Sequence, residues 1–426
     1  MTKMNIFFLG LYATFYLLGC SSQPQQPYAM TADSTATRQM AAATNQDPEC
    51  RNIWVTIKNR KDSQIRSNPA HFWCWINRNL PQELNQLVNP PYIGQVTADP
   101  HYFNFADLHR DSQTPLSGLG LVDVDDSGQG PFIYDFIRYA VFVRAYNKDS
   151  DKDHLKDLIA NYKQGLEANQ NDIIKTPKVL QKAIDHTRQE LEQEHAHWVK
   201  KNPWDQKFFE KFDLKSTQKL EPQDKTSLNQ LKQTILNEQK IQISKEAYTV
   251  HESGSSKGQI RFWFLATKPQ HENFIFECKA LAEPATAQVL TQDTPATRIN
   301  QVLKYYSDFQ ANSYDDLDSF VATLNPQNAF WCRYRHFQFL DREDIKNLDE
   351  KDLKKLSEYF AYWLGYKVSY QLKNNKKKFL QDLNDVSHLT TILDNLISKY
   401  NQTFKQLNKD GLSIEEAHAS ATGDED

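Results

Sequence analysis

Three neighbouring segments carry the residues from which we predict the fold. They read Ala98-Asp99-Pro100-His101-Tyr102-Phe103-Asn104-Phe105, then Asp123-Val124-Asp125-Asp126, then Gly130-Pro131-Phe132-Ile133-Tyr134-Asp135. The first segment predicts a tight loop. The apolar residues 119–122 predict a short strand that ends in the acidic cluster. The residues after Gly130 predict an apolar helix that carries Asp135 and Arg138. Consecutive elements therefore bring together carboxylates, an amide and an arginine.

The spacing of Asp99 and Asn104 suits phosphoryl transfer. In a catalytic loop of this kind the aspartate orients or deprotonates the acceptor hydroxyl, and the asparagine oxygen holds Mg²⁺. Asp123, with Asp125 as an auxiliary ligand, would supply the hard oxygen atoms that Mg²⁺ prefers. Each signal alone is weak, because acidic triplets also form solvated turns and calcium-like loops. Their order along the chain is more specific.

The whole stretch resembles the bacterial family called domain of unknown function 2252. That family has a Gly-Asp-x-His-x-x-Asn-Phe loop, then Asp-Phe-Asp-Glu, then Gly-Pro and Asp-x-x-Arg. The corresponding residues here are Ala98, Asp99, His101, Asn104 and Phe105, then Asp123 to Asp126, then Gly130, Pro131, Asp135 and Arg138. The resemblance implies that Asp135 and Arg138 are structural and that Asp135 braces the catalytic loop through its backbone.

The resemblance also implies an α+β, two-lobed protein-kinase-like fold with its elements in permuted order, a large helical lobe and a small antiparallel sheet lobe. The phosphate-covering turn would be residues 251–258, with Gly254 and Gly258. Lys279 would reach the phosphates of ATP from a strand and would lie across a cleft from Asp123. Residues 298–309 would form the helix behind it. The implied cofactors are Mg²⁺ and ATP.

Three departures from the family pattern bear on catalysis. Serines replace glycines within the turn at Ser253, Ser255 and Ser256. Ala280 follows the lysine where the family has glutamate, and Gln301 takes a helix position where the family tends to have glutamate. An ion pair that orders Lys279 is therefore not expected.

The N-terminus predicts a lipoprotein precursor. Lys3 precedes an apolar run over residues 6–18 that is too short to span a membrane, and Leu17-Leu18-Gly19-Cys20 forms a cleavage and lipidation box. We expect a signal peptide over 1–19, acylation such as palmitate on Cys20, and a flexible tether over 20–48. Ser21 favours the outer membrane, facing the periplasm. The alternative is an uncleaved anchor or a later start codon.

Composition excludes some classes of partner. The 426 residues carry a formal net charge of −4, which gives no sign of nucleic-acid binding, and 12% aromatic residues indicate a folded protein. Cys50, Cys74, Cys278 and Cys332 remain besides Cys20, an even number in a compartment that permits disulfides. Their spacing leaves the partners open. The kinase-like resemblance implies a Cys278–Cys332 bond and leaves Cys50 and Cys74 as the second pair.

Hydrophobic patterns divide the rest of the chain. Residues 260–266 and 273–278 predict a hairpin, and 329–339 a third strand. Residues 353–370 and 379–407 predict helices. We therefore expect a catalytic-loop and helical lobe over 49–245, a sheet lobe over 246–345, C-terminal helices over 346–410 and a disordered acidic tail over 411–426.

Two hypotheses for the function remain open. The first is a membrane-anchored, ATP- and Mg²⁺-dependent phosphotransferase with Asp99 as catalytic carboxylate, acting on an unknown small molecule or envelope component. The second is a non-catalytic binding or scaffold lipoprotein with a degenerate kinase-like fold. In both, the acylated Cys20 joins the protein to a lipid bilayer.

Overall fold

The computed structural model describes most of the chain after residue 47. The described residues are 48–54, 65–107, 119–121, 123–147, 152–169, 176–182, 199–250, 259–268, 271–306, 319–325, 328–334, 345, 347–383 and 385–421. The predicted signal peptide, Cys20, the tether, Gly254 and Gly258 lie outside these residues. The chain divides into a unit of residues 1–46 and a compact unit of residues 47–426, and everything below concerns the second.

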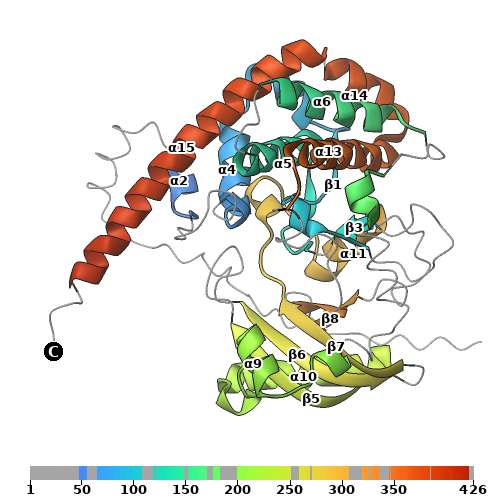
Figure 1. The fold of residues 1–426 in the computed structure, drawn as a ribbon, viewed down its shortest axis with the longest axis vertical. Coiled ribbons are helices and arrows are strands. Elements are labelled where there is room, and N and C mark those ends of the chain that lie inside the picture. Colours follow the sequence, from blue (N-terminus) through green and yellow to red (C-terminus); the bar gives the residue numbers. More distant parts are fainter. Residues whose placement is uncertain are drawn as a thin grey trace, which may run out of the picture. The chain divides into compact units, whose positions relative to one another are not determined.

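The compact unit is α+β, and its two kinds of structure occupy different parts (Figure 1). The helical part contains α2 (Pro48–Arg51), α4 (Pro69–Asn79), α5 (Phe132–Tyr146), α6 (Lys152–Glu167), α13 (Glu350–Leu372), α14 (Lys376–Asp382) and α15 (Val386–Ala421). Two small antiparallel pairs lie within it, namely β1 (Ile93–Val96) with β4 (Gly128–Pro131), and β2 (Phe105–Asp107) with β3 (Leu119–Leu121).

Helix α5 is buried on nearly all sides because its sequence is apolar around the whole circumference. Helices α6 and α13 pack closely at two glycines. A Cβ on Gly165 would lie 2.0 Å from the Tyr362 carbonyl oxygen, and one on Gly365 would lie 2.1 Å from the Tyr162 oxygen. Only residues without a side chain allow the two backbones to approach this closely.

The second part is a five-stranded antiparallel sheet in the order β5-β6-β7-β9-β8. Its strands are β5 (Gln242–Val250), β6 (Ile260–Lys268), β7 (His271–Ala280), β8 (Ser319–Asn325) and β9 (Asn328–Tyr334). The predicted hairpin is confirmed as β6 and β7, and the predicted third strand is β9. Helix α11 (Pro295–Tyr306) lies between β7 and β8 in the sequence.

The two faces of the sheet differ because alternate side chains point to opposite sides. One face is apolar and packs against α10 (Pro222–Gln239) through Leu228, Leu231 and Ile235. At one end of the other face, Trp263 and Ile275 pack against Phe208 of α9 (Gln206–Phe212).

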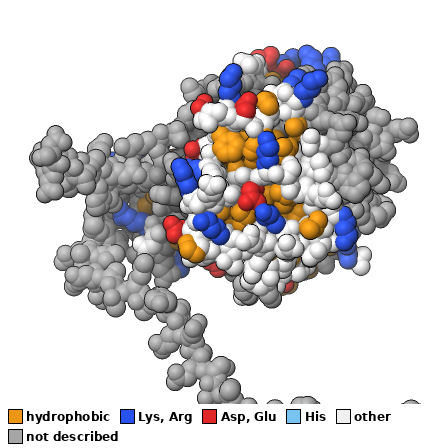
Figure 2. All heavy atoms as spheres, turned by 90° about the horizontal axis from the view of Figure 1, so that it is seen from below, with side chains coloured by type: hydrophobic (Ala, Val, Ile, Leu, Met, Phe, Trp, Pro, Cys, Tyr) orange, Lys and Arg blue, Asp and Glu red, His pale blue; other side chains and the backbone are white. Residues whose placement is uncertain are grey.

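Seen from below, the molecule shows hydrophobic side chains interspersed with lysine and arginine (Figure 2).

Two predicted boundaries differ from the structure. The sheet begins at Gln242, before the predicted boundary at 246. Helix α10 also precedes that boundary, but it packs on the sheet because three apolar side chains of this largely polar helix contact the apolar face. Helix α15 continues to Ala421, so residues 411–421 are helical where we predicted a disordered tail. The Glu- and Ala-rich sequence there favours a helix.

Both predicted disulfides are confirmed. Cys50 is bonded to Cys74, which joins α2 to α4, and their Cα atoms are 5.6 Å apart. Cys278 is bonded to Cys332 across the β7–β9 ladder, in which the two residues are direct partners. Within the described part of the chain, no helix combines the length and the apolar character needed to cross a membrane.

Candidate functional site

The Asp99–Asn104 loop follows β1, and Asp135 of α5 holds the residues that lead into it. The Asp135 carboxylate accepts hydrogen bonds from the backbone N–H groups of Thr97 (3.0 Å) and Ala98 (2.8 Å) and from the Thr97 hydroxyl (3.0 Å). The indole of Trp73 donates to the Ala98 carbonyl at 2.8 Å. Ala98 has φ 62°, a conformation that L-residues adopt only when their surroundings impose it.

Asp99 is fixed by a buried arginine. Arg138 donates to Asp99 Oδ1 from Nε (3.0 Å) and from Nη2 (2.7 Å), and Nη2 also donates to the Ile65 carbonyl at 2.6 Å. His101 Nε2 lies 3.5 Å from Asp99 Oδ2. Burial opposes ionisation of Asp99, but Arg138 and His101 outweigh it and hold its pKa below the usual value. Asp99 is therefore ionised and oriented.

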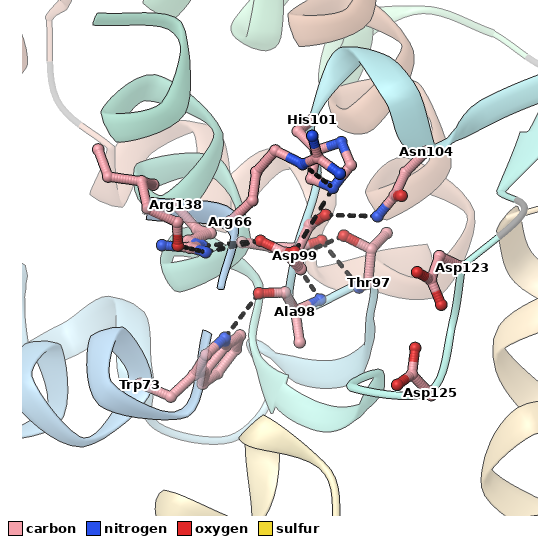
Figure 3. Close-up of polar contacts among 12 residues, drawn as sticks. Arg66, Trp73, Thr97, Ala98, Asp99, His101, Asn104, Asp123, Asp125 and Arg138 are labelled. Carbon is pink, nitrogen blue, oxygen red and sulfur yellow. Dashed lines mark hydrogen bonds and ion pairs between the residues drawn. The ribbon is translucent and has the colours of Figure 1, made fainter. Parts of the chain in front are cut away.

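Asn104 closes the loop. Its side-chain Nδ2 donates to the backbone carbonyl of Asp99 at 2.8 Å, which directs the side-chain oxygen to the other side. In Figure 3, Asn104, Asp123 and Asp125 lie on the same side of Asp99. The predicted metal ligands therefore gather in one region beside the predicted catalytic carboxylate.

Arg298 of α11 shapes the acidic loop after β3. Its Nη1 donates to the carbonyls of Asp125 (2.5 Å) and Ser127 (2.6 Å), and Asp126 accepts the Ala285 N–H at 3.3 Å. The side chain of Arg298 is fully buried, and burial lowers its pKa to about 10. These contacts turn the Asp125 side chain toward the sheet.

The three carboxyl groups of this loop differ electrostatically. Burial and the neighbouring Asp125 raise the pKa of Asp123, whose side chain stays 40% exposed while its Oδ1 is buried. Burial opposes ionisation of Asp125, but Lys279 outweighs it and lowers the pKa. Burial, Asp125 and Asp99 raise the pKa of Asp126 well above the usual value. Of the three, Asp125 is the carboxyl group whose pKa is lowered.

Lys279, near the end of β7, faces this loop. Its Nζ lies 2.5 Å from Asp125 Oδ2 and 3.5 Å from Asp123 Oδ1, and only 3% of its side chain is exposed. Burial opposes its charge, but Asp123 and Asp125 outweigh burial and raise its pKa. Lys279 faces Asp123 as we expected, but at ion-pair distance rather than across a cleft, and Asp125 is the nearer partner.

The departures noted in the sequence have structural counterparts. Gln301 of α11 accepts a short hydrogen bond from the Gln95 side chain. The expectation that no ion pair orders Lys279 is wrong, because Asp123 and Asp125 of the acidic loop supply the carboxylates that the family pattern takes from glutamate. The predicted glycines 254 and 258 lie outside the described residues, so the turn that would cover phosphate is not part of the site as described.

A cavity of about 140 Å³ adjoins the acidic loop. Asp125 and Asp126 line it together with Gln259, Glu283 and the first residues of α4. Gln259 directly follows the segment predicted to cover phosphate, which lies outside the described residues. The volume of the cavity is below that of a pocket for a whole nucleotide.

Sequence reasoning missed three charged residues near the site, namely Arg261, Glu277 and Arg298, and gave Arg333 as a strand residue that is either plain surface charge or directed at an anion. Arg298 belongs to no recognisable sequence motif, because its partners are the backbone carbonyls of Asp125 and Ser127, which are far away in the sequence. Glu277 and Arg333 form a buried pair with Arg333 Nη2 2.6 Å from Glu277 Oε1, and Arg261 Nη1 lies 3.7 Å from the same oxygen. The alternation of Glu277 with Lys279 on one strand was the available signal, since both side chains point to one face.

Among the residues that the structure describes, no group of three or more His, Cys, Asp and Glu side chains is arranged to hold a metal ion. Comparison with known proteins gives no match to a protein-family model, to a curated protein or to a solved structure.

Proposed function

We propose that this protein is a membrane-anchored kinase-like phosphotransferase that uses ATP and Mg²⁺ to phosphorylate a hydroxyl of a small molecule or envelope component. The observation that carries the proposal is the position of Lys279, 2.5 Å from Asp125 and 3.5 Å from Asp123, opposite a loop that holds Asp99 and Asn104. A lysine, a metal-binding carboxylate and a catalytic aspartate in one place are the parts that phosphoryl transfer needs.

The residues present fit a magnesium ion bound jointly with phosphate. Asp123 Oδ1 is buried and accepts no hydrogen bond from the described residues, and the amide orientation of Asn104 leaves its oxygen available. Mg²⁺ commonly takes one or two protein oxygens and completes its shell with phosphates and water. When bound, Mg²⁺ would neutralise charge on the transferring phosphate.

The protein's own groups would act as follows. Arg138 keeps Asp99 ionised, so Asp99 accepts the hydrogen bond of the acceptor hydroxyl and orients it toward the phosphate. Lys279 provides a point charge for the phosphate chain once Asp125 releases it. Asp135 keeps the loop in register by binding the N–H groups of Thr97 and Ala98.

Magnesium-dependent ATP binding by the full chain, purified in mild detergent with its disulfides intact, tests the proposal. Calorimetry should detect binding to the wild type and a loss of at least about tenfold in affinity for Asp123→Asn. Asp157→Asn is the matched control, because Asp157 is an exposed acid paired with Lys354. Equal binding by all three proteins would exclude Asp123 as a ligand, and no binding by the folded wild type would overturn the proposal.

A second candidate is a binding or scaffold protein that no longer transfers phosphate. The favouring observation is the engagement of Lys279 by Asp125, with Gln301 bound to Gln95 where the family tends to place glutamate. This candidate predicts Mg²⁺-dependent ligand binding without release of ADP over hours. ADP release that stops in Asp99→Asn would exclude it.

We also propose that acylated Cys20 anchors the protein to the outer membrane, facing the periplasm. The support is the cleavage and lipidation box in the sequence. Cys20→Ser should move the protein from the membrane fraction to the soluble fraction and remove the acyl mass from its N-terminal peptide. Unchanged fractionation would contradict the anchor.

A further inference from the structure

Three adjacent strands place positive side chains on the face of the sheet that carries Lys279. Arg261 of β6 is the direct cross-strand partner of Lys279, and Arg333 of β9 is the partner of Glu277. Direct partners point to the same face, and residues two apart on one strand also share a face. Arg261, Lys279 and Arg333 therefore form a row, which we call the cationic row.

The cationic row faces the acidic loop. Burial raises the pKa of Asp125, and Lys279 and Arg261 lower it to a value below the usual one. Burial and Asp125 raise the pKa of Asp123, against which Lys279 and Arg333 act. Asp123 and Asp125 thus lie within the electrostatic reach of all three cations, at the position proposed for the metal.

The members of the row are neutralised to different degrees. Arg333 is held by the buried Glu277 at 2.6 Å, and Lys279 by Asp125 at 2.5 Å. Arg261 has only a long contact of 3.7 Å with Glu277, and its buried Nε donates no hydrogen bond to the described residues. A buried guanidinium N–H without an acceptor costs free energy unless a ligand supplies one. Arg261 is thus placed to receive an anion.

The same face offers little to a nucleobase. A purine ring is bound mainly through apolar contacts on its faces. Here charged residues flank Lys279, namely Arg261, Glu277 and Arg333. The aromatic neighbour, Trp331, is buried, and the Arg333 guanidinium lies over its ring at 5.3 Å. Its ring is therefore already covered.

We infer that the site formed by the acidic loop and the cationic row recognises its phosphate donor by the phosphate chain rather than by the base, and that Arg261 is a phosphate-binding residue. This inference rests on the proposed function. Bound Mg²⁺ would offset the charges of Asp123 and Asp125 and leave the cationic row with excess positive charge, so anion binding should require the metal. An inorganic polyphosphate and the chain of a nucleoside triphosphate share this chemistry.

Calorimetry of the full oxidised chain with tripolyphosphate, ATP and adenosine, each with Mg²⁺, tests the inference. We expect tripolyphosphate and ATP to bind within about tenfold of each other and adenosine not to bind, because one lost apolar ring contact would cost more than this in a base-specific site. ATP binding more than about a hundredfold tighter than tripolyphosphate, or competition by adenosine, would overturn the inference.

The variant Arg261→Gln should weaken both phosphate ligands by about tenfold, the effect of losing one hydrogen bond to a charged group. Glu277 keeps Arg333 in this variant, so the sheet should fold, as a thermal melt would verify. Arg261→Lys should restore part of the affinity. Arg144→Gln is the matched control, since Arg144 pairs with Asp394 of α15 at 2.6 Å. Wild-type affinity in Arg261→Gln would exclude Arg261.

The outcomes separate the two proposals. If tripolyphosphate binds without Mg²⁺ and equally well to Asp123→Asn, phosphate binding by the cationic row stands, but its requirement for the metal and the metal site itself fail. If ATP binds with Mg²⁺ but Arg261→Gln has no effect, the proposed function stands and this inference fails. Absence of any phosphate binding contradicts both.

Discussion

Asp135 accepts the backbone N–H of Ala98 at 2.8 Å, and that bond helps to hold Ala98 at φ 62° immediately before Asp99. A left-handed conformation costs an L-residue roughly 1–2 kcal/mol. The carboxylate in the first turn of the core helix α5 therefore stabilises the conformation of the loop that carries the candidate catalytic residue.

The contribution of Asp135 to the stability of the protein should fall as pH rises from about 4 to about 7. Burial raises the pKa of Asp135 from 3.8 to about 7, against the opposing bonds from Thr97 and Ala98. Between these values the folded state binds the proton that the unfolded state has lost, so the free energy of unfolding decreases with pH. The raised pKa values of Asp123 and Asp126 act in the same direction, whereas the pKa values of His71 and His101, which burial lowers, act in the opposite direction.

Urea denaturation at several pH values measures this slope for the wild type and for Asp135→Asn. The variant should be less stable at low pH and show a shallower slope. Asp157→Asn serves as the exposed control. An unchanged slope in Asp135→Asn would assign the effect to other groups.

Lys279 and Asp125 should be strongly coupled. Lys279→Met leaves Asp125 buried without its cation and should cost about 3–5 kcal/mol of stability, because removing one partner of a buried pair strands the other charge. Asp125→Asn in the same chain should recover most of this loss. A double-mutant cycle by denaturation gives the coupling, and additive single effects would contradict the pairing.

Gly365→Ala should destabilise the packing of α6 against α13. The added methyl group would lie 2.1 Å from the Tyr162 carbonyl oxygen, so the helices must move apart, at a cost of about 1–3 kcal/mol or more. The exposed helical residue Ala160 gives the control Ala160→Ser. Thermal denaturation that ranks Gly365→Ala no lower than the control would show that the interface relaxes freely.

The two disulfides should contribute comparable stability. Their sequence separations of 24 and 54 residues correspond to about 3 and about 4 kcal/mol in the chain-entropy description. The variants Cys50→Ser/Cys74→Ser and Cys278→Ser/Cys332→Ser should lose these amounts in chemical denaturation. Mass spectrometry of unreduced peptides that found any other pairing would contradict both bonds.

Much of the candidate site could be predicted because it lies in one stretch of sequence. The spacing of Asp99, Asn104 and Asp135 is local, and a loop and a helix that follow each other keep such residues together. The opposition of Lys279 and Asp123 came from the family resemblance, since nothing in the intervening residues indicates it. In the structure, Lys279 Nζ lies 3.5 Å from Asp123 Oδ1.

Other parts could not be predicted, for physical reasons. Arg298 holds the acidic loop through backbone carbonyls, which leave no trace in residue types. Helix α10 packs on the sheet with few apolar side chains, so its hydrophobic pattern was too weak to show its partner. The preference of Lys279 for Asp125 depends on the turn of a short loop, where one residue changes the direction of a side chain.

The Cys50–Cys74 bond also defines a mechanical route. Tension applied to the chain before Cys50 would be transmitted to α4 through that bond, close to Trp73, whose indole donates a hydrogen bond to the Ala98 carbonyl. Force applied on the N-terminal side would therefore reach the loop of Asp99 through α4 and Trp73 before it reached the rest of the helical core.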